Sequence, residues 1–260
     1  MNILIINLPR HADRLAFQHE QMQRLGLSFQ VLNAVDVTTL PEDTFQKLAD
    51  TWERPMRKVE VCCFLSHKAA WQLVLDHNQP ALILEDDALL ANTVPSLLAE
   101  LSKQKEFDLV TLEIRARKKI IGQHSIPITA ALSLRPLFQD RTGAAGYVLW
   151  PSGAKKLLDK AATGRAAIAD AFISSHYALN AFQVDPAAIV QLDMCGHYGL
   201  PSPLTTTSSI GSVDRPVATK SPWQFTVRRL LAQLRMAGRI LSVWHKAERR
   251  YVALNKQHFE

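Results

Sequence analysis

The sequence has few of the features that mark secreted or membrane-spanning proteins. Its 260 residues contain only three cysteines, Cys62, Cys63 and Cys195. Because the number is odd and two of them are adjacent, a disulfide framework is not expected, and a reducing compartment suits the chain. The sequence has no run of roughly 18 apolar residues, and its start, MNILIINLPR, lacks the basic segment and long apolar run of a signal peptide. These absences predict a cytoplasmic protein.

The composition, with 47% hydrophobic and 21% charged residues, is that of an ordinary globular protein and does not indicate disorder. The sequence also shows no internal repeat. The net charge of +6 is unevenly distributed: residues 215–260 contain ten Lys or Arg and two Glu, a balance of +8, which leaves −2 for residues 1–214. A slightly acidic body does not favour nucleic acid as a partner. We therefore divide the chain into a body, residues 1–214, and a basic tail, residues 215–260.

Strand-like and helical patterns alternate along the body. Strands are expected at 2–8, 28–36, 81–87, 107–114 and 144–150, with an extended segment at 182–192. Helices are expected at 10–27, 59–78, 93–103 and 151–162, and a Ser/Thr-rich loop at 202–212. This order predicts an α/β fold with a mixed, mainly parallel sheet flanked by helices, in which ligands bind at the carboxyl ends of the strands.

Three consecutive acids, Glu85, Asp86 and Asp87, follow the apolar run Ala-Leu-Ile-Leu in the stretch PALILEDDALL. A run without polar alternation is typical of a strand that is buried on both faces. Carboxylates at its end suit Mn²⁺ or Mg²⁺, which commonly bridges to substrate phosphates. The alternative is structural, because acids are also favoured at the start of a helix.

Six motifs occur in order along the chain: INLPRHADR, NAVD, CCFLSHKAAW, ALILEDDALL, TGAAGYVLWPSGAKKLL and AIADAF. Together they resemble glycosyltransferase family 25, which includes bacterial lipooligosaccharide galactosyltransferases and animal enzymes that glycosylate collagen. The resemblance covers about residues 2 to 211. One departure is Cys62, where the family usually has glycine before CFLSH; we interpret it as a packing change.

The resemblance implies a GT-A-like fold and a metal-dependent enzyme that inverts the anomeric carbon. The implied donor is a UDP-hexose, most often UDP-galactose, and the cofactor is Mn²⁺ or Mg²⁺. The implied acceptor is an oligosaccharide or glycolipid of lipopolysaccharide or lipooligosaccharide. Two other classes remain open: another metal–phosphate enzyme, such as a phosphohydrolase or nucleotidyltransferase, and a non-catalytic, membrane-associated saccharide-binding protein.

The resemblance also assigns roles to polar residues. Asp87 and Glu85 are the expected metal ligands, with Glu85 alternatively on ribose or a metal-bound water. The expected donor-binding residues are Asn7, Arg10, Arg14, Asp36, Ser66, His67, Glu85, Asp86, Thr142, Gly143 and Gln191. Several have structural alternatives: a solvated helix face for Arg14, a turn for Asp36 and for 142–144, and a buried structural histidine for His67. Trp71 is expected in the core.

An inverting transfer needs a general base that deprotonates the acceptor hydroxyl. Asp170 is the first candidate, since it is the only acid in GRAAIADAF and matches an acid of the family. Its alternative role is a helix N-cap. Glu113, at the end of the strand expected at 107–114, is the second candidate because that end should face the same crevice. His197 is a candidate third metal ligand.

The tail has helical periodicity over residues 222–256. Its apolar positions fall on one side, namely Trp223, Val227, Leu230, Leu231, Leu234, Leu241 and Trp244, and its basic residues lie largely elsewhere. An apolar stripe with tryptophan beside a basic face is typical of a helix at an anionic membrane surface. This pattern predicts a peripheral protein on the inner face of a bacterial inner membrane. The alternative is a helix that packs on its own domain or on a second copy.

Overall fold

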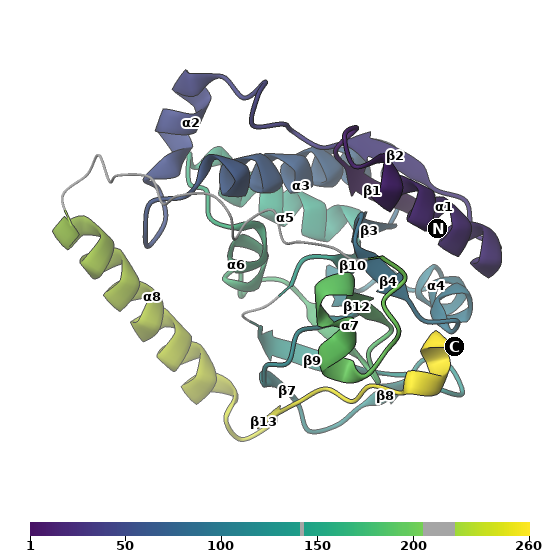
Figure 1. Cartoon of the computed structure of the whole chain (residues 1–260). Coiled ribbons are helices and arrows are strands. Elements are labelled where there is room, and N and C mark those ends of the chain that lie inside the picture. The colour runs from purple at the N-terminus through teal and green to yellow at the C-terminus, as the bar shows by residue number, and fades with distance from the viewer. Residues whose placement is uncertain (141–142, 205–221) are drawn as a thin grey trace.

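The computed structural model describes residues 1–140, 143–204 and 222–260 (Figure 1). In these residues a 10-stranded sheet has the order β13-β7-β9-β11-β5-β10-β3-β1-β2, with β8 beside β9. The bounds of its strands are β1 Asn2–Asn7, β2 Gln30–Asn33, β3 Ala81–Glu85, β5 Leu109–Thr111, β7 Lys119–Gly122, β8 Ile126–Pro127, β9 Ser133–Gln139, β10 Gly146–Leu149, β11 Ala181–Asp185 and β13 Ala247–Arg250.

The part of this sheet that carries the site has one dominant strand direction. Strand β1 is parallel to β2 and β3, and β11 is parallel to β5. Strand β10 lies between β3 and β5 and is antiparallel to both, so β3 and β5 point the same way. The predicted α/β fold with a mixed sheet flanked by helices is confirmed, and β1, β3 and β5 present their carboxyl ends on one edge of the sheet.

Helices cover both faces of the sheet, which explains the apolar runs without alternation. In β1, Ile3 and Ile5 face one core together with residues of α1 (Ala12–Leu25) and α4 (Val94–Leu101). Leu4 and Ile6 face a second core. The helices of that second core are α3 Lys58–His77, α5 Pro151–Ala162 and α6 Ala169–Ser174. A strand between two cores buries every side chain, as predicted for 81–84.

A second, 3-stranded sheet has the order β4-β12-β6, with β4 Ala88–Leu90, β6 Glu113–Ile114 and β12 Ile189–Gln191. The single strand predicted at 107–114 is therefore wrong: the chain leaves the large sheet after β5 and enters the small sheet at β6. Leu112 marks the change, because its N–H donates to Gly146 while its carbonyl accepts from Ala188 and Ile189. The small sheet brings Glu113 and Gln191 next to the acids that follow β3.

The single helix predicted at 222–256 is also wrong beyond Val243. Helix α8 (Pro222–Val243) ends there, and β13 pairs antiparallel with the edge strand β7. An edge strand has unpaired backbone groups, and β13 satisfies them. Arg250 also donates to Asp185 at 3.0 Å, and Val252 and Phe259 are buried. The division at 214/215 stays a prediction, with residues 247–259 packed on the body.

The remaining short elements are α2 Glu42–Ala49, η1 Leu192–Met194, α7 Cys195–Tyr198 and η2 Lys256–Phe259. Most of the loop predicted at 202–212 lies outside the described residues. Across the ranges that the structure describes, no helix is long and apolar enough to cross a bilayer.

Candidate active site

Two cavities bear on the predicted site residues, and the larger of these, about 190 Å³, lies at the carboxyl ends of β1 and β3. It gathers predicted site residues that are far apart in the sequence, namely Arg10, Arg14, Ser66, His67, Glu85, Asp86, Asp87 and Gln191. It also includes residues that the sequence did not point to, among them Cys63, Arg115 and Asp193. Asn7 and Asp36 are not among its lining residues, but each bonds one that is, Asp86 and Arg10 respectively. Thr142 lies outside the described residues.

Asp86 is the anchored member of the acid triplet. Its Oδ2 accepts from Asn7 Nδ2 at 2.8 Å, its Oδ1 accepts from Arg14 Nη1 at 2.9 Å, and its backbone carbonyl accepts from Gln18. Burial raises the pKa of this carboxyl, although Arg14 acts in the opposite direction. A strand, β4, follows the triplet, so the alternative that these acids begin a helix is wrong. Asp86 fixes the turn between β3 and β4.

Glu85 and Asp87, the outer acids, converge on one amide. Gln191 Nε2 donates to Glu85 Oε2 at 3.0 Å and to Asp87 Oδ1 at 3.4 Å. The amide oxygen of Gln191 accepts from Arg115 Nη1, and Arg115 Nη2 pairs with Asp193 Oδ2 at 2.7 Å. Since the arginine can only donate, it fixes which end of the Gln191 amide faces the acids. The two carboxylates are thus held side by side.

Their electrostatics fit a divalent cation. Burial raises the pKa of Asp87 to about 7, and the charges of Glu85 and Asp86 act in the same direction. A cation between Glu85 and Asp87 would relieve this repulsion, and carboxylate oxygens are the ligands that Mn²⁺ and Mg²⁺ prefer. The donor set therefore fits the predicted ion.

A chain of buried hydrogen bonds leads to Glu85 from the opposite side. Trp71 Nε1 donates to Tyr147 Oη at 2.8 Å, Tyr147 Oη lies 2.9 Å from His67 Nδ1, and His67 Nε2 lies 3.2 Å from Glu85 Oε1. The carboxylate of Glu85 can only accept, so His67 directs an Nε2 proton at it; in that tautomer of the neutral ring, Nδ1 accepts the proton of Tyr147. The bond from His67 holds the pKa of Glu85 below its ordinary value, against the effect of burial. Trp71 lies in the core, as predicted.

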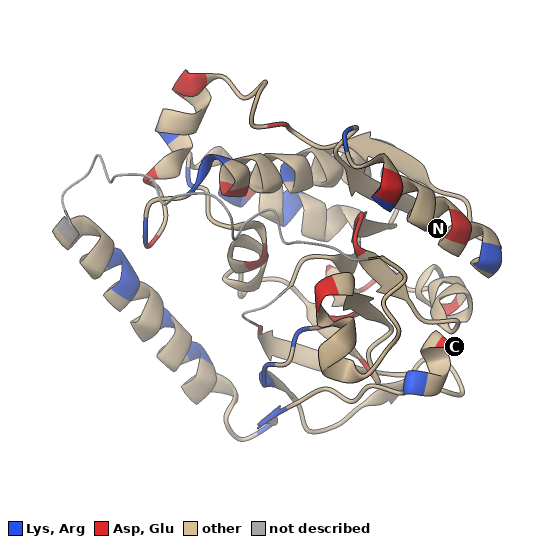
Figure 2. Ribbon diagram, in the orientation of Figure 1, with Lys and Arg blue, Asp and Glu red and all other residues tan. Residues whose placement is uncertain are grey.

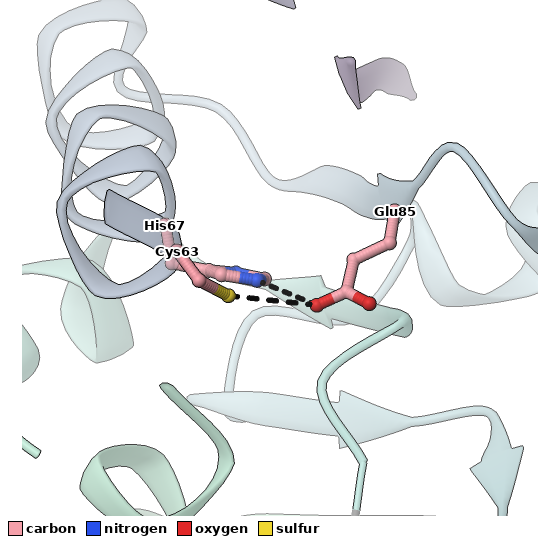
Figure 3. Close-up of side chains that lie close together, drawn as sticks. All are labelled: Cys63, His67 and Glu85. Atoms are coloured by element: carbon pink, nitrogen blue, oxygen red, sulfur yellow. Dashed lines mark hydrogen bonds and ion pairs between the residues drawn. The ribbon is translucent and has the colours of Figure 1, made fainter. Parts of the chain in front are cut away.

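Figure 3 shows Cys63 and His67 pointing from α3 toward the carboxylate of Glu85. Their ligand atoms all lie within 4.8 Å of one another, which is compatible with a metal ion. However, the Nε2 proton of His67 is directed at Glu85, and burial raises the pKa of the Cys63 thiol well above its ordinary value. His67 therefore orients Glu85, and the oxygen pair of Glu85 and Asp87 stays the predicted cation site.

The structure separates the two candidate bases. Glu113 is only 1% exposed, its Oε2 accepts from Ala145 N–H at 2.8 Å, and burial raises its pKa to about 8. Gly143, with φ of +81°, passes over this carboxylate so closely that a Cβ would overlap Glu113 Oε2. Glu113 thus lies beneath the wall, outside both cavities. Gly143 thus lies against Glu113, and its predicted contact with the donor stays a prediction.

Asp170 lines the smaller cavity instead, near the start of α6. The N-cap position belongs to Ile168, so the capping alternative is wrong; Asp170 Oδ1 accepts from Ala171 N–H at 2.7 Å. Burial raises the pKa of Asp170, the Ala171 bond lowers it, and the negative charge of Glu85 raises it.

Other predicted residues have mainly local partners. Ser66 Oγ accepts from Val35 N–H and donates to Cys62, which joins α3 to the segment after β2. Asp36 accepts from Thr38 and pairs with Arg10, as a turn residue would. His197 is exposed on α7, outside the larger cavity.

The sequence did not single out Arg115 and Tyr147. Arg115 directly follows β6, and a basic residue after a strand is a usable signal once the small sheet is known. Tyr147 lies within an apolar run, where a buried tyrosine hydroxyl requires a partner.

A cavity at the strand ends of an α/β fold, with paired carboxylates flanked by arginines, is typical of enzymes that act on phosphorylated substrates. Residues 1–173 match the model of glycosyltransferase family 25, described as an LPS biosynthesis protein, and the chain belongs to this family. The resemblance seen in the motifs is confirmed.

Three relatives illustrate the range of the family. The chain is 29% identical over 178 residues to a glycosyltransferase 25 family member of Aedes aegypti, which covers 61% of this chain and 28% of that protein. It is 25% identical over 246 residues to procollagen galactosyltransferase 1-B of Xenopus laevis, covering 82% and 39%. It is 26% identical over 203 residues to the lacto-N-neotetraose biosynthesis glycosyltransferase LgtE of Neisseria gonorrhoeae, covering 72% of each. The chain thus spans well under half the length of the first two relatives.

Among solved structures, the inositol-1-phosphate CTP transferase from T. maritima aligns with a TM-score of 0.43 and 12% identity, covering 79% of this chain and 92% of that one. A similarity this distant does not indicate a shared function.

Proposed function

We propose that the chain transfers a hexose from a UDP-sugar, galactose in the first instance, to a saccharide of lipopolysaccharide or lipooligosaccharide, with inversion of the anomeric carbon and with Mn²⁺ or Mg²⁺. The observation that carries the proposal is the convergence of Glu85 and Asp87 on Gln191 in the larger cavity. Membership of family 25 supports it, as do the printed names of the Neisseria and Xenopus relatives.

In this proposal Glu85 and Asp87 hold the cation, and a bound ion supplies Lewis-acid stabilisation to the departing diphosphate. Arg14 and Arg115 line the same cavity with guanidinium groups fixed by Asp86 and Asp193, and they offer positive charge to phosphate oxygens. Asp170 takes the proton of the acceptor hydroxyl. The remaining predicted donor contacts stay predictions. They are at Asn7, Arg10, Asp36, Ser66, His67, Asp86, Thr142, Gly143 and Gln191. Asn7, His67 and Gln191 hold the carboxylates of the acid triplet through the hydrogen bonds described above.

We also propose that α8 rests on an anionic membrane surface, so that the protein is peripheral on an inner leaflet. The inner side of α8, with Phe225 and Val243, is buried, whereas the outer stripe is exposed, with Trp223 at 63%; Trp244, directly after the helix, is also exposed, at 73%. The other exposed apolar residues of α8 are Val227, Leu230, Leu231, Leu234, Ile240 and Leu241. The helix has four arginines and no acid (Figure 2). Apolar area beside positive charge suits anionic lipid.

A thermal-shift series tests the donor site. Wild type and Asp87→Ala are melted with UDP, UDP-galactose, UDP-glucose and UDP-N-acetylhexosamines, each with and without Mn²⁺. A ligand that binds only the native state at 100 times its Kd adds about 2.7 kcal/mol to the free energy of unfolding. We expect one UDP-sugar to stabilise wild type only with metal, and Asp87→Ala to lose this effect. No shift with any nucleotide would contradict the proposal.

UDP release distinguishes the other classes. A phosphohydrolase would release product from the donor without any acceptor, and a binding protein would release none. A transferase releases UDP at the full rate only when both the acceptor and the metal are present.

A further inference from the structure

Cys63, His67 and Glu85 form a cluster with a softer set of ligand atoms than the oxygen pair of Glu85 and Asp87. Cys63 and His67 are four positions apart on α3, so both side chains leave the same face of the helix. His67 Nε2 lies 3.2 Å and Cys63 Sγ 3.9 Å from Glu85 Oε1, and the ligand atoms all lie within 4.8 Å of one another (Figure 3). All three residues line the larger cavity, so an ion in solution can reach them.

These separations fit a tetrahedral zinc ion. Zinc binds thiolate sulfur at about 2.3 Å, imidazole nitrogen at about 2.0–2.1 Å and carboxylate oxygen at about 2.0–2.2 Å. Two such ligand atoms at a tetrahedral angle are about 3.4–3.6 Å apart. The distances of 3.2 Å and 3.9 Å to Glu85 Oε1 therefore depart from this geometry by only a few tenths of an ångström. Modest side-chain rotations complete three bonds, and the cavity leaves the fourth position to water.

The two oxygens of Glu85 face different neighbours. Oε1 is directed at Cys63 and His67, whereas Oε2 accepts from Gln191 Nε2, the amide that also donates to Asp87. The Oε1 side offers sulfur and nitrogen, which select an ion such as Zn²⁺, and the Oε2 side offers oxygens, which select Mn²⁺ or Mg²⁺. One carboxylate thus borders two places of different ligand chemistry.

The protons on Cys63 and His67 argue against a hard cation at this cluster, but they do not prevent zinc binding. A thiol that coordinates a metal ion of this kind is deprotonated outright, and its proton passes to water. When His67 Nε2 binds the ion, the ring proton lies on Nδ1, 2.9 Å from Tyr147 Oη, which can accept it. An oxygen partner on the second ring nitrogen is the usual support of a metal-bound histidine. The thiolate and the carboxylate balance the charge of the ion, so no unpaired charge is buried.

We propose that Cys63, His67 and Glu85 Oε1 bind a thiophilic divalent cation, zinc in the first instance, beside the Mn²⁺ or Mg²⁺ site proposed at Glu85 and Asp87. Because Glu85 borders both sites, an ion on Oε1 withdraws negative charge from Oε2 and repels a second divalent cation. Zinc therefore inhibits the proposed transfer. This consequence rests on the proposed function, whereas the zinc site itself does not.

Cobalt absorption tests the ligand set. Co²⁺ is a spectroscopic substitute for zinc, and a bond from thiolate to Co²⁺ gives a strong charge-transfer band in the near ultraviolet. The full chain, kept reduced with a phosphine, is titrated with Co²⁺ as wild type, Cys63→Ser and Cys63→Ala. The matched control is Cys62→Ser, because Cys62 is the neighbouring free cysteine and is not part of the cluster. Circular dichroism checks the folding of each variant, and Cys63→Ala decides if Cys63→Ser does not fold.

We expect wild type and the control to show the band with one equivalent of Co²⁺, and both Cys63 variants to lack it. Zn²⁺ should abolish the band by displacing cobalt, because its filled d shell gives no such absorption. A wild type without the band, or a folded Cys63 variant that keeps it, would overturn the inference.

Calorimetric titration with Mn²⁺ tests the shared carboxylate. The Zn²⁺ concentration that halves Mn²⁺ binding should be at least about tenfold lower in wild type and Cys62→Ser than in Cys63→Ser, since only the first two keep the Cys63 thiolate. Equal concentrations would mean that zinc competes at the oxygen pair alone, and would overturn the inference. If wild type shows the cobalt band but binds no Mn²⁺, the proposed function fails and the zinc site stands.

Discussion

Most charged side chains around the larger cavity are at least partly buried, whereas large apolar side chains are exposed along α8. Both regions depart from the usual distribution of residues in a folded protein, in opposite directions. Around the cavity nearly every charge has a fixed partner, as Asp86 has in Asn7 and Arg14. Along α8 the large apolar side chains of residues such as Trp223 and Leu241 are exposed to solvent. The first pattern sets the geometry of a reaction, and the second provides a surface for contact.

Changes around the larger cavity should lower turnover even with a soluble acceptor. Changes on the outer stripe of α8 should leave that turnover intact and alter only where the protein resides. The substitutions below test this separation.

Asp87→Asn should have the largest effect. It keeps the shape of the side chain and removes one of the two anionic groups proposed to hold the cation. We expect kcat/KM to fall by roughly 10²- to 10⁴-fold, because a metal contributes several kcal/mol to stabilising the transition state. Mn²⁺ affinity, measured by calorimetry, should fall in parallel. The control is Asp159→Asn on the surface of α5. If the two variants are equally active, Asp87 does not belong to the active site.

Tyr147→Phe should have the next largest effect on turnover. It removes the hydroxyl that joins Trp71 to His67, and so frees the His67 ring that orients Glu85. Loss of such a supporting bond costs roughly 10- to 100-fold in metal affinity or activity. The free energy of unfolding should fall by about 1–3 kcal/mol, because buried polar atoms lose their partner. A fall in stability with unchanged kcat and Mn²⁺ affinity would show that the chain of bonds is structural only.

Gly143→Ala tests the partition over Glu113. Gly143 has φ of +81° and lies against the Glu113 carboxylate, whereas Gly164, with φ of +76°, has nothing within 4 Å of an added Cβ. Gly143→Ala should lower the free energy of unfolding by about 1–3 kcal/mol, and Gly164→Ala by about 1 kcal/mol, since only the first adds a steric overlap to the strained backbone. Urea denaturation measures both. If both substitutions lower the free energy of unfolding by the same amount, the overlap with Glu113 does not contribute to the loss of stability.

The double substitution Leu234→Glu with Leu241→Glu should have the smallest effect on turnover. Both side chains are exposed, so activity toward a soluble glycoside should stay within about twofold of wild type. Binding to sedimented vesicles that contain anionic lipid should be lost, and wild-type binding should weaken as salt rises. If wild type does not bind the vesicles but forms a dimer, and this variant is a monomer, then α8 is a contact between two copies of the chain and not a membrane surface.

The sequence was informative where structure is local. The strand at the N-terminus, the helix at 58–77 and the αL residue Gly26 at the end of α1 follow from periodicity and capping, and the acid triplet lies at a strand end as predicted. The fold class followed from the alternation of these elements.

The errors concern interactions between distant segments. Leu112 looks like the middle of one strand, and only its partners Gly146 and Ala188 show that two sheets meet there. Residues 247–250 have helical periodicity, yet pairing with β7 overrides that local preference. Tyr147 carries no local sign that its hydroxyl meets Trp71 and His67. Likewise, no periodicity could show that Gly143 covers Glu113 and leaves Asp170 as the accessible acid.

The central claim is that Glu85 and Asp87 form a metal-dependent site for transfer of a hexose from UDP. The most direct measurement follows UDP release and glycoside formation together, with wild type and Asp87→Asn. Metal-free wild type, prepared with EDTA, is assayed before and after Mn²⁺ is restored. The account predicts that wild type is inactive without metal, that Mn²⁺ restores equal amounts of UDP and glycoside, and that Asp87→Asn is not rescued. Full activity in EDTA, or full activity of Asp87→Asn, would contradict it.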